Sequence, residues 1–201
     1  TEDETGVMIA GAPATLDLAL NKPYTKSLEP YFYYPDTNNS ELTDGRPGNT
    51  WDSAVGYYIW WYGGPTLTVD VTVDLKDVYK IAKARCSTGG EIPTKYSADK
   101  MEILTSVDNI NFMSNGVYTN TTKAFWTELT FSPTSARYVK FRITKTADGW
   151  YLFIGEVEVY GAPGPITGTI ETSWMGIPVE STLGNFTSGK TLNGGTITHK
   201  Y

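Results

Sequence analysis

The clearest pattern in the chain is a strict alternation of apolar and polar side chains over residues 66–75, TLTVDVTVDL. Every even position is Thr or Asp, and the odd positions are Leu67, Val69, Val71, Val73 and Leu75. Because successive side chains of a β-strand point to opposite faces, a period of two predicts a strand with one buried face. A helix could not place these apolar residues on one side.

Shorter patterns predict further strands along the chain. The ranges are residues 78–86, 100–106, 125–131, 137–144 and 153–160, with weaker signals at 16–21 and in the aromatic run YYIWWY at 57–62. Glycine, proline and asparagine separate them, as is typical of turns. Short strands at this spacing, with no amphipathic helix between them, predict an all-β protein with an antiparallel sandwich or barrel.

The same pattern divides the chain into three parts. Residues 1–16 are acidic and then contain Gly, Ala and Pro, and we interpret them as a tail or linker. Residues 17–161 hold the predicted strands and are numerous enough to bury a full core. The sequence GAPGP, which begins at residue 161, is typical of a linker. The Thr- and Gly-rich residues 162–201 either add strands to the domain or begin a neighbouring unit.

The net charge and the scarcity of cysteine and histidine exclude several classes of function. The formal net charge is -6 and no basic stripe is visible, which argues against nucleic-acid partners and against insertion into an anionic membrane. The single cysteine, Cys86, excludes an intrachain disulfide. With one histidine, His199, the chain lacks the ligands of a Cys/His zinc site and the usual partners of a nucleophilic catalytic pair.

A tightly turned loop, LTDGRPGNTWD at residues 42–52, offers oxygen ligands. Asp44, Asn49 and Thr50 supply carboxylate, amide and hydroxyl oxygens, which are the ligands that a hard cation such as calcium prefers. A second pair of carboxylates, Glu156 and Glu158, lies on the last predicted strand. We expect one of these to close a cation site with the loop. The alternative is that Asp44 belongs to an ordinary turn and that the strand carboxylates are solvated.

Aromatic residues next to polar loop residues suggest a sugar site. A sugar ring packs its C–H face on an aromatic ring, while its hydroxyl groups need fixed donors and acceptors. The candidates lie in the run at 31–34, in YYIWWY and in the turn KTADGWY, and they are Tyr33, Trp60, Trp61, Asp148 and Trp150. The alternative is burial, because a strand at 57–62 would place half of its rings in the core.

The order of these motifs resembles a known family. LTDG, a strand ending in VDL, an arginine-bearing strand end, SVDNINF, ARYVKFRIT and IGEVEVYG follow one another as in the discoidin or coagulation factor V/VIII type C superfamily. The likeness covers roughly residues 17–161 and is greatest to the bacterial family 32 carbohydrate-binding modules. It implies an eight-stranded antiparallel jelly-roll sandwich with a structural calcium ion and a sugar site on loops at one end. It implies no catalysis.

The resemblance also assigns residues to these sites. Asp44 and Glu156 would give carboxylate oxygens to calcium, Asn49 or Thr50 would complete the shell, and main-chain carbonyls would come from Glu41, Arg46 and Gly155. Arg85 would bind the sugar, because related modules often place an arginine there. The family further implies a secreted or cell-surface bacterial protein, in which this domain is joined to the other domains of a larger glycoside-active enzyme.

Two other functions remain open at this stage. The same exposed aromatic loops could bind a protein in an adhesion or interaction domain. Paired carboxylates could act in a small hydrolase or lyase, although no pair lies in a recognisable catalytic setting.

Overall fold

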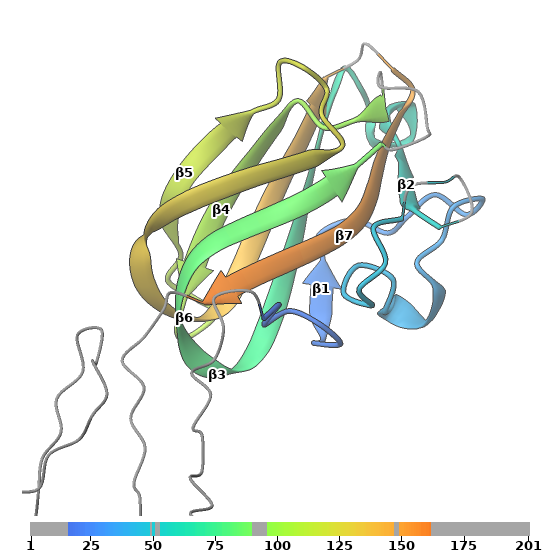
Figure 1. The fold of residues 1–201 in the computed structure, drawn as a ribbon. Coiled ribbons are helices and arrows are strands. Elements are labelled where there is room, and N and C mark those ends of the chain that lie inside the picture. Colours follow the sequence, from blue (N-terminus) through green and yellow to red (C-terminus); the bar gives the residue numbers. More distant parts are fainter. Residues whose placement is uncertain (1–15, 49, 51–52, 90–95, 147–148, 162–201) are drawn as a thin grey trace, which may run out of the picture. The chain divides into compact units, whose positions relative to one another are not determined.

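The computed structural model describes residues 16–48, 50, 53–89, 96–146 and 149–161, in which β-strands predominate (Figure 1). The elements are β1 (Tyr24–Lys26), η1 (Thr37–Asn39), β2 (Val55–Tyr58), η2 (Ile59–Tyr62), β3 (Thr66–Thr88), β4 (Lys100–Ser106), β5 (Met113–Thr119), β6 (Trp126–Thr146) and β7 (Tyr151–Gly161). η1 and η2 are single turns of 3-10 helix. No helix in the described ranges is long and apolar enough to cross a membrane.

Two long strands, β3 and β6, each take part in both layers of a sandwich. The first half of β3 pairs with the second half of β6, from Thr66 opposite Thr146 to Asp74 opposite Tyr138. The register then shifts, and the second half of β3 pairs with the first half of β6. Lys76 lies in this shift with a positive φ of 73°, so the strand bends there instead of ending.

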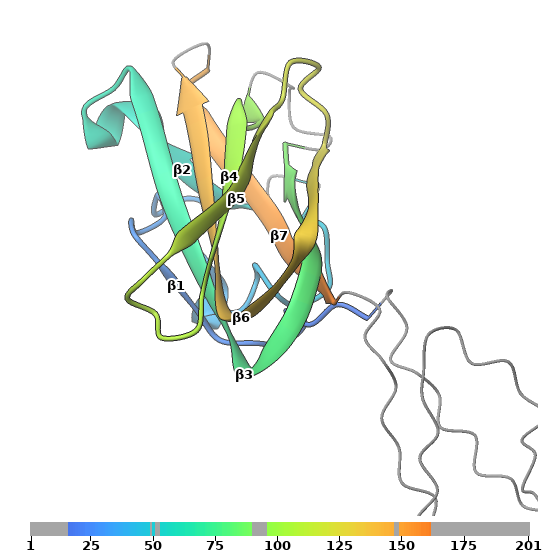
Figure 2. The same ribbon diagram turned by 90° about the vertical axis from the view of Figure 1, so that its left-hand side faces the viewer.

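The pairing of the other strands completes two antiparallel layers (Figures 1 and 2). One layer runs β5–β4–β6–β3–β1 and contains the second half of β6 and the first half of β3. The other runs β2–β7–β3–β6 and contains the opposite halves of the two long strands. The predicted all-β antiparallel sandwich is therefore confirmed, whereas the count of eight strands stays a prediction.

The core lies between the two layers and follows the predicted alternation. Leu67, Val69, Val71, Val73 and Leu75 are buried in one cluster with Phe141, Ile143, Val157 and Val159. The Thr and Asp residues that alternate with them face outward. The range predicted at 100–106 is observed as β4, and 78–86 and 153–160 lie within β3 and β7. The ranges 125–131 and 137–144, predicted as separate strands, are parts of β6.

Three short segments differ from the prediction. The aromatic run at 57–62 is a strand only to Tyr58, because the N–H of Gly63 and that of Gly64 bond back to the carbonyls of Trp60 and Ile59 and close a helical turn. Residues 16–21 form turns and a single bridge between Asp17 and Tyr160, not a strand. β1 and β5 were not predicted, since β1 is three residues long and the β5 sequence MSNGVYT is mostly polar.

Candidate functional site

The first candidate site is formed where a loop covers a buried carboxylate of β7. Glu156 is fully buried, and its Oε1 accepts a hydrogen bond of 3.1 Å from the N–H of Gly45, 111 residues earlier in the chain. The N–H of Val157 donates to the carbonyl of Leu42 at 2.9 Å and fixes the start of the loop along β7. Gly48 then runs so close to β7 that a Cβ there would lie 2.5 Å from the Cα of Gly155.

Burial raises the pKa of the Glu156 carboxyl from its ordinary 4.5 to about 8. The charges of Asp44, Asp17 and Glu158 act in the same direction, and only the N–H of Gly45 lowers the pKa. The second oxygen, Oε2, is buried and has no hydrogen-bond partner among the described residues. A buried carboxylate without a full set of partners is costly, and a cation or a proton would lower that cost.

The other residues predicted to bind calcium lie around this carboxylate with different contacts. Asp44 is close enough to raise the pKa of Glu156, and its Oδ1 accepts the N–H of Arg46 at 2.8 Å. The Glu41 carboxylate accepts the N–H of Thr37 at 3.1 Å. The Thr50 hydroxyl lies 2.7 Å from that of Ser53. Asn49 lies outside the described residues.

The donor set suits a hard cation more than a transition metal. The oxygens that the structure brings together are those of Asp44 and the partnerless Oε2 of Glu156. No group of three or more His, Cys, Asp or Glu side chains capable of holding a metal occurs in the part of the chain that the structure describes. An ion here would thus depend on main-chain oxygens for most of its shell, as calcium sites allow.

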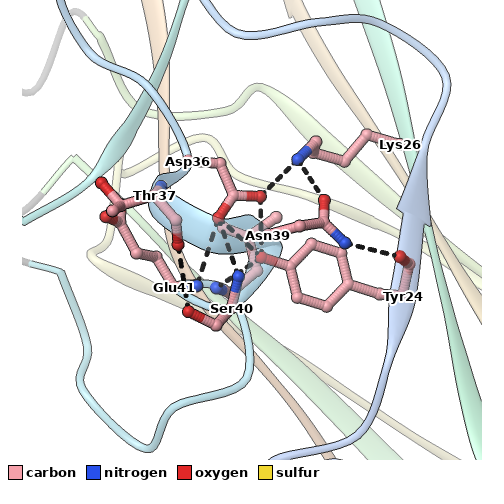
Figure 3. A network of polar contacts seen from close by, with 8 residues as sticks. Tyr24, Lys26, Asp36, Thr37, Asn39, Ser40 and Glu41 are labelled. Atoms are coloured by element: carbon pink, nitrogen blue, oxygen red, sulfur yellow. Dashed lines mark hydrogen bonds and ion pairs between the residues drawn. The ribbon is translucent and has the colours of Figure 1, made fainter.

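A buried polar network fixes the segment that leads into this loop (Figure 3). The Asp36 side chain is fully buried and accepts hydrogen bonds from the Tyr24 hydroxyl at 2.7 and 2.8 Å. It also forms an ion pair with Lys26 and accepts the N–H groups of Ser40 (3.1 Å) and Glu41 (3.2 Å). Because one carboxylate holds both β1 and η1, residues 36–41 are rigidly positioned against the sandwich.

The second candidate site is a group of exposed aromatic side chains near the start of β7. We call Phe32, Tyr33, Trp60, Trp61 and Trp150 the aromatic rim; each is between 55% and 69% exposed. Rings of this size are usually at least partly buried, so an exposed group of them is a candidate for a binding surface.

Tyr31 connects the aromatic rim to the strands behind it. Its ring centroid lies 4.5 Å from that of Phe32, 5.6 Å from that of Tyr33 and 6.1 Å from that of Trp61. Behind Tyr31 are Tyr58 of β2 at 5.3 Å and Tyr151 of β7 at 5.9 Å. The rim therefore stands on a rigid aromatic base.

Main-chain contacts bring the three parts of the rim together. The N–H of Tyr31 donates to the carbonyl of Gly56 at 2.7 Å, and the N–H of Gly56 donates to the carbonyl of Tyr34 at 3.0 Å. Only glycine fits at position 56, because a Cβ there would lie 2.7 Å from the Phe153 ring and from Tyr34. The N–H of Ile59, at the start of η2, donates to the carbonyl of Trp150 at 2.8 Å.

Of the predicted sugar-binding residues, the structure gathers Tyr33, Trp60, Trp61 and Trp150 near this end of β7. Arg85 does not join them. It lies opposite Glu158 of β7, which is seven residues or about 23 Å of strand from Tyr151. There it forms an ion pair with Glu158 and stacks over Trp126 at 4.1 Å. Asp148 lies outside the described residues.

Sequence reasoning placed the run at 31–34, which contains Phe32, among the candidates, but named only Tyr33 in it as a ligand residue. Tyr58 and Tyr151 were not named, although they lie in the candidate motifs YYIWWY and KTADGWY. Their place behind the rim depends on the pairing of β2 with β7.

Comparisons with known proteins agree with this architecture. The family model of the F5/8 type C domain matches residues 25–157. No curated protein matches the sequence.

Several solved structures share the fold at low sequence identity. A fucose-binding module of Streptococcus pneumoniae has a TM-score of 0.56 and 21% identity, covering 73% of this chain and 96% of that one. The family 32 carbohydrate-binding module of NanJ from Clostridium perfringens, in complex with galactose, has a TM-score of 0.53 and 18% identity, with 70% and 93% covered. A chitosan-binding module of a Paenibacillus sp. IK-5 chitosanase/glucanase, in complex with chitotriose, has a TM-score of 0.54 and 21% identity, with 72% and 100% covered.

Proposed function

The chain belongs to the F5/8 type C domain family, and from that premise we propose that it is a non-catalytic module that binds carbohydrate through the aromatic rim. The observation that carries the proposal is the exposure of Phe32, Tyr33, Trp60, Trp61 and Trp150 around one end of β7. Solved structures with this fold include modules in complex with galactose and with chitotriose, which supports the ligand class.

The rim is suited to binding sugars weakly. Indole and phenol rings offer flat apolar faces to the C–H groups of a sugar, and the phenol hydroxyl of Tyr33 can exchange hydrogen bonds with its hydroxyls. The site is open to solvent, so little ligand surface is buried. We expect a Kd of about 1 mM for a monosaccharide, or about 4 kcal/mol of binding free energy. Several copies of such a module in a larger protein would raise the avidity.

We also propose a structural calcium ion between the loop 41–50 and β7. Its ligands would be the carboxylates of Asp44 and Glu156, the main-chain carbonyls of Glu41, Arg46 and Gly155, and an oxygen of Asn49 or Thr50. The support is the buried, partnerless Oε2 of Glu156 beside Asp44. When bound, the ion would neutralise these carboxylates and hold the loop against β7, which stabilises the folded state by mass action.

A secreted or cell-surface bacterial protein is the proposed setting. The S. pneumoniae, C. perfringens and Paenibacillus structures are bacterial, and one of them is part of a chitosanase/glucanase. In such a protein the module would hold a glycan near the other domains. Asp17 and Tyr160 pair at the far end of β7 from the rim, so residues 17 and 160 of the domain lie away from the proposed sugar site.

The test is a glycan array probed with the whole chain, with calcium and with a chelator. We expect binding to a restricted set of glycans. The double variant Trp61→Ala/Trp150→Ala should lose at least about tenfold in affinity, since rings at the centre of a site carry most of its binding energy. Ile110→Ala, which removes an apolar side chain that is 80% exposed outside the rim, is the matched control and should bind normally. Unchanged binding by the double variant would refute the rim as the sugar site.

A second candidate function is protein binding through the same rim. Phe32 favours it, because its exposed ring has no polar group for sugar hydroxyls. Phe32→Ala would then abolish capture of a host or bacterial surface protein while the array shows no glycan bound. For a sugar site, Phe32→Ala should weaken glycan binding less than Trp61→Ala does.

A further inference from the structure

Two rings of the aromatic rim point in different directions because they come from one helical turn. In η2, Ile59 is fully buried and Tyr62 packs against the core. A 3-10 helix has three residues per turn, so positions 59 and 62 lie on the same side of η2 and the two residues between them lie on its other sides. Trp60 and Trp61, 55% and 67% exposed, therefore leave η2 in directions about 120° apart.

Contacts with neighbouring segments fix the two indole rings on different sides of η2. The Trp60 ring lies beside the turn that follows the helix, since a Cβ on Gly64 would lie 2.9 Å from that ring. The Trp61 ring lies beside Tyr31, with ring centroids 6.1 Å apart and an angle of 63° between the planes. One indole is thus held next to the 63–64 turn and the other next to the segment 31–34.

The rim continues beyond Tyr31 onto a tight turn. The N–H of Tyr34 donates to the carbonyl of Tyr31 at 2.8 Å, which places Phe32 and Tyr33 at the tip of the turn. The planes of these two rings differ by 39°, and they differ from the plane of Tyr31 by 53° and 62°. From Trp60 to Tyr33 the rim is therefore a series of differently tilted rings and not one flat surface.

The rim offers more ring surface than one monosaccharide can cover. A pyranose has two faces, so a single sugar unit can stack on at most two aromatic rings. The rim exposes five rings, and at two rings per unit its full use needs at least three sugar units. A crystalline polysaccharide would need rings in one plane. A single glycan chain can turn from one unit to the next and so can follow rings of different tilt.

The rim side chains also indicate the kind of sugar. None of the five carries a charge, so the rim suits a neutral glycan. Rings that approach a chain from different directions need C–H groups on both faces of its units. Units whose ring substituents are all equatorial, such as β-linked glucose and N-acetylglucosamine, have axial C–H groups on both faces. The axial 4-hydroxyl of galactose makes one of its faces polar.

We propose that the rim binds at least three consecutive units of one neutral, β-linked glycan chain with equatorial substituents. The chain would run from Trp60 across Trp61 to the turn that carries Phe32 and Tyr33. Trp150, whose carbonyl accepts the N–H that begins η2 at 2.8 Å, would contact the units beside Trp61. This inference rests on the proposed function, because it names the glycan that the same rim would bind.

The test is an NMR titration of the ¹⁵N-labelled whole chain with N-acetylglucosamine, glucose and galactose, and with the β-1,4-linked tetrasaccharide of each. A site for one unit could hold a tetrasaccharide in four positions, which would raise the affinity at most about fourfold. For N-acetylglucosamine or glucose we expect the tetrasaccharide to bind at least about tenfold more tightly than the monosaccharide, because several rings are engaged at once.

The outcomes separate this inference from the proposed function. A ratio of at most about fourfold would refute the extended site and leave the sugar-binding rim intact. Binding of the galactose series alone would overturn the assignment of equatorial units. If the chain binds none of these sugars but binds another glycan on the array, only the inference fails; if it binds no glycan at all, both fail.

Variants at the two ends of the rim make the test specific. Trp60→Ala and Tyr33→Ala should each weaken tetrasaccharide binding at least about fivefold and leave the monosaccharide affinity within about twofold, because one unit would bind over the central Trp61. Trp61→Ala should weaken the binding of both ligands. Ile110→Ala, which truncates an apolar side chain that is 80% exposed outside the rim, should change neither affinity. Unchanged tetrasaccharide binding by both end variants, or an equal loss of both ligands in Trp60→Ala, would refute the extended site.

Discussion

Removing calcium should make the stability of the domain depend on pH through one buried side chain, Glu156. The pKa of its carboxyl is raised to about 8 in the folded protein, against an ordinary value of 4.5. The folded state therefore binds this proton more tightly than the unfolded state does. In the presence of a chelator, the contribution of Glu156 to the free energy of unfolding is therefore greatest below pH 4.5 and falls as the pH rises toward 8.

The size of this decrease in the free energy of unfolding follows from the difference between the folded and the ordinary pKa of Glu156. Within the window the free energy of unfolding falls by up to about 1.4 kcal/mol per pH unit, and by at most about 5 kcal/mol in total. Bound calcium would take the place of the proton on the ionised carboxylate, so saturating calcium should remove most of the fall above pH 6. Stability would be measured by urea unfolding at pH 5, 6, 7 and 8, with calcium and with chelator.

Glu156→Gln is the decisive variant, since its neutral amide cannot ionise. We expect its stability in chelator to lack the fall between pH 5 and 8, and calcium to stabilise it much less than the wild type. Glu29→Gln, which removes the same charge at an exposed position, should keep the wild-type profile. Identical pH profiles for wild type and Glu156→Gln would show that Glu156 is not the responsible group. A pH profile that calcium leaves unchanged would contradict its role as a ligand.

Three further substitutions test the framework that positions the sites, each by urea unfolding. Asp36→Ala should cost about 3 kcal/mol or more, because it leaves the buried Lys26 ammonium group without its partner; a cost under about 1 kcal/mol would contradict the buried network. Phe141→Ala, in the centre of the core, should cost about 3–5 kcal/mol, and a near-neutral effect would contradict the assigned core. Gly48→Ala should cost more than about 1 kcal/mol, since φ is 58° and a Cβ would lie 2.5 Å from β7; if it also abolishes calcium stabilisation, the loop and the ion are coupled.

Much of the fold follows from local patterns. The alternation from Leu67 to Leu75 could belong only to a half-buried strand, and β4 was predicted to the residue. Failures occurred where distant contacts decide the conformation. The β3 strand continues through its bend at Lys76 because β6 bends beside it, and no local pattern separates such a bend from a turn between two strands. β1 is a strand because it pairs with the first half of β3.

The sequence by itself determined that this is an all-β protein with oxygen-rich and aromatic loops, because side-chain period and composition are local properties. The residues alone left Glu156 and Glu158 equivalent, because both alternate with the buried Val157 on β7 and so point to the same side, and only the family resemblance named Glu156. Their different surroundings come from the tertiary structure: the N–H of Gly45 donates to Glu156, whereas Glu158 pairs with Arg85. Burial depends on which distant segment lies above a side chain, and so does the grouping of Tyr33, Trp61 and Trp150 into one surface.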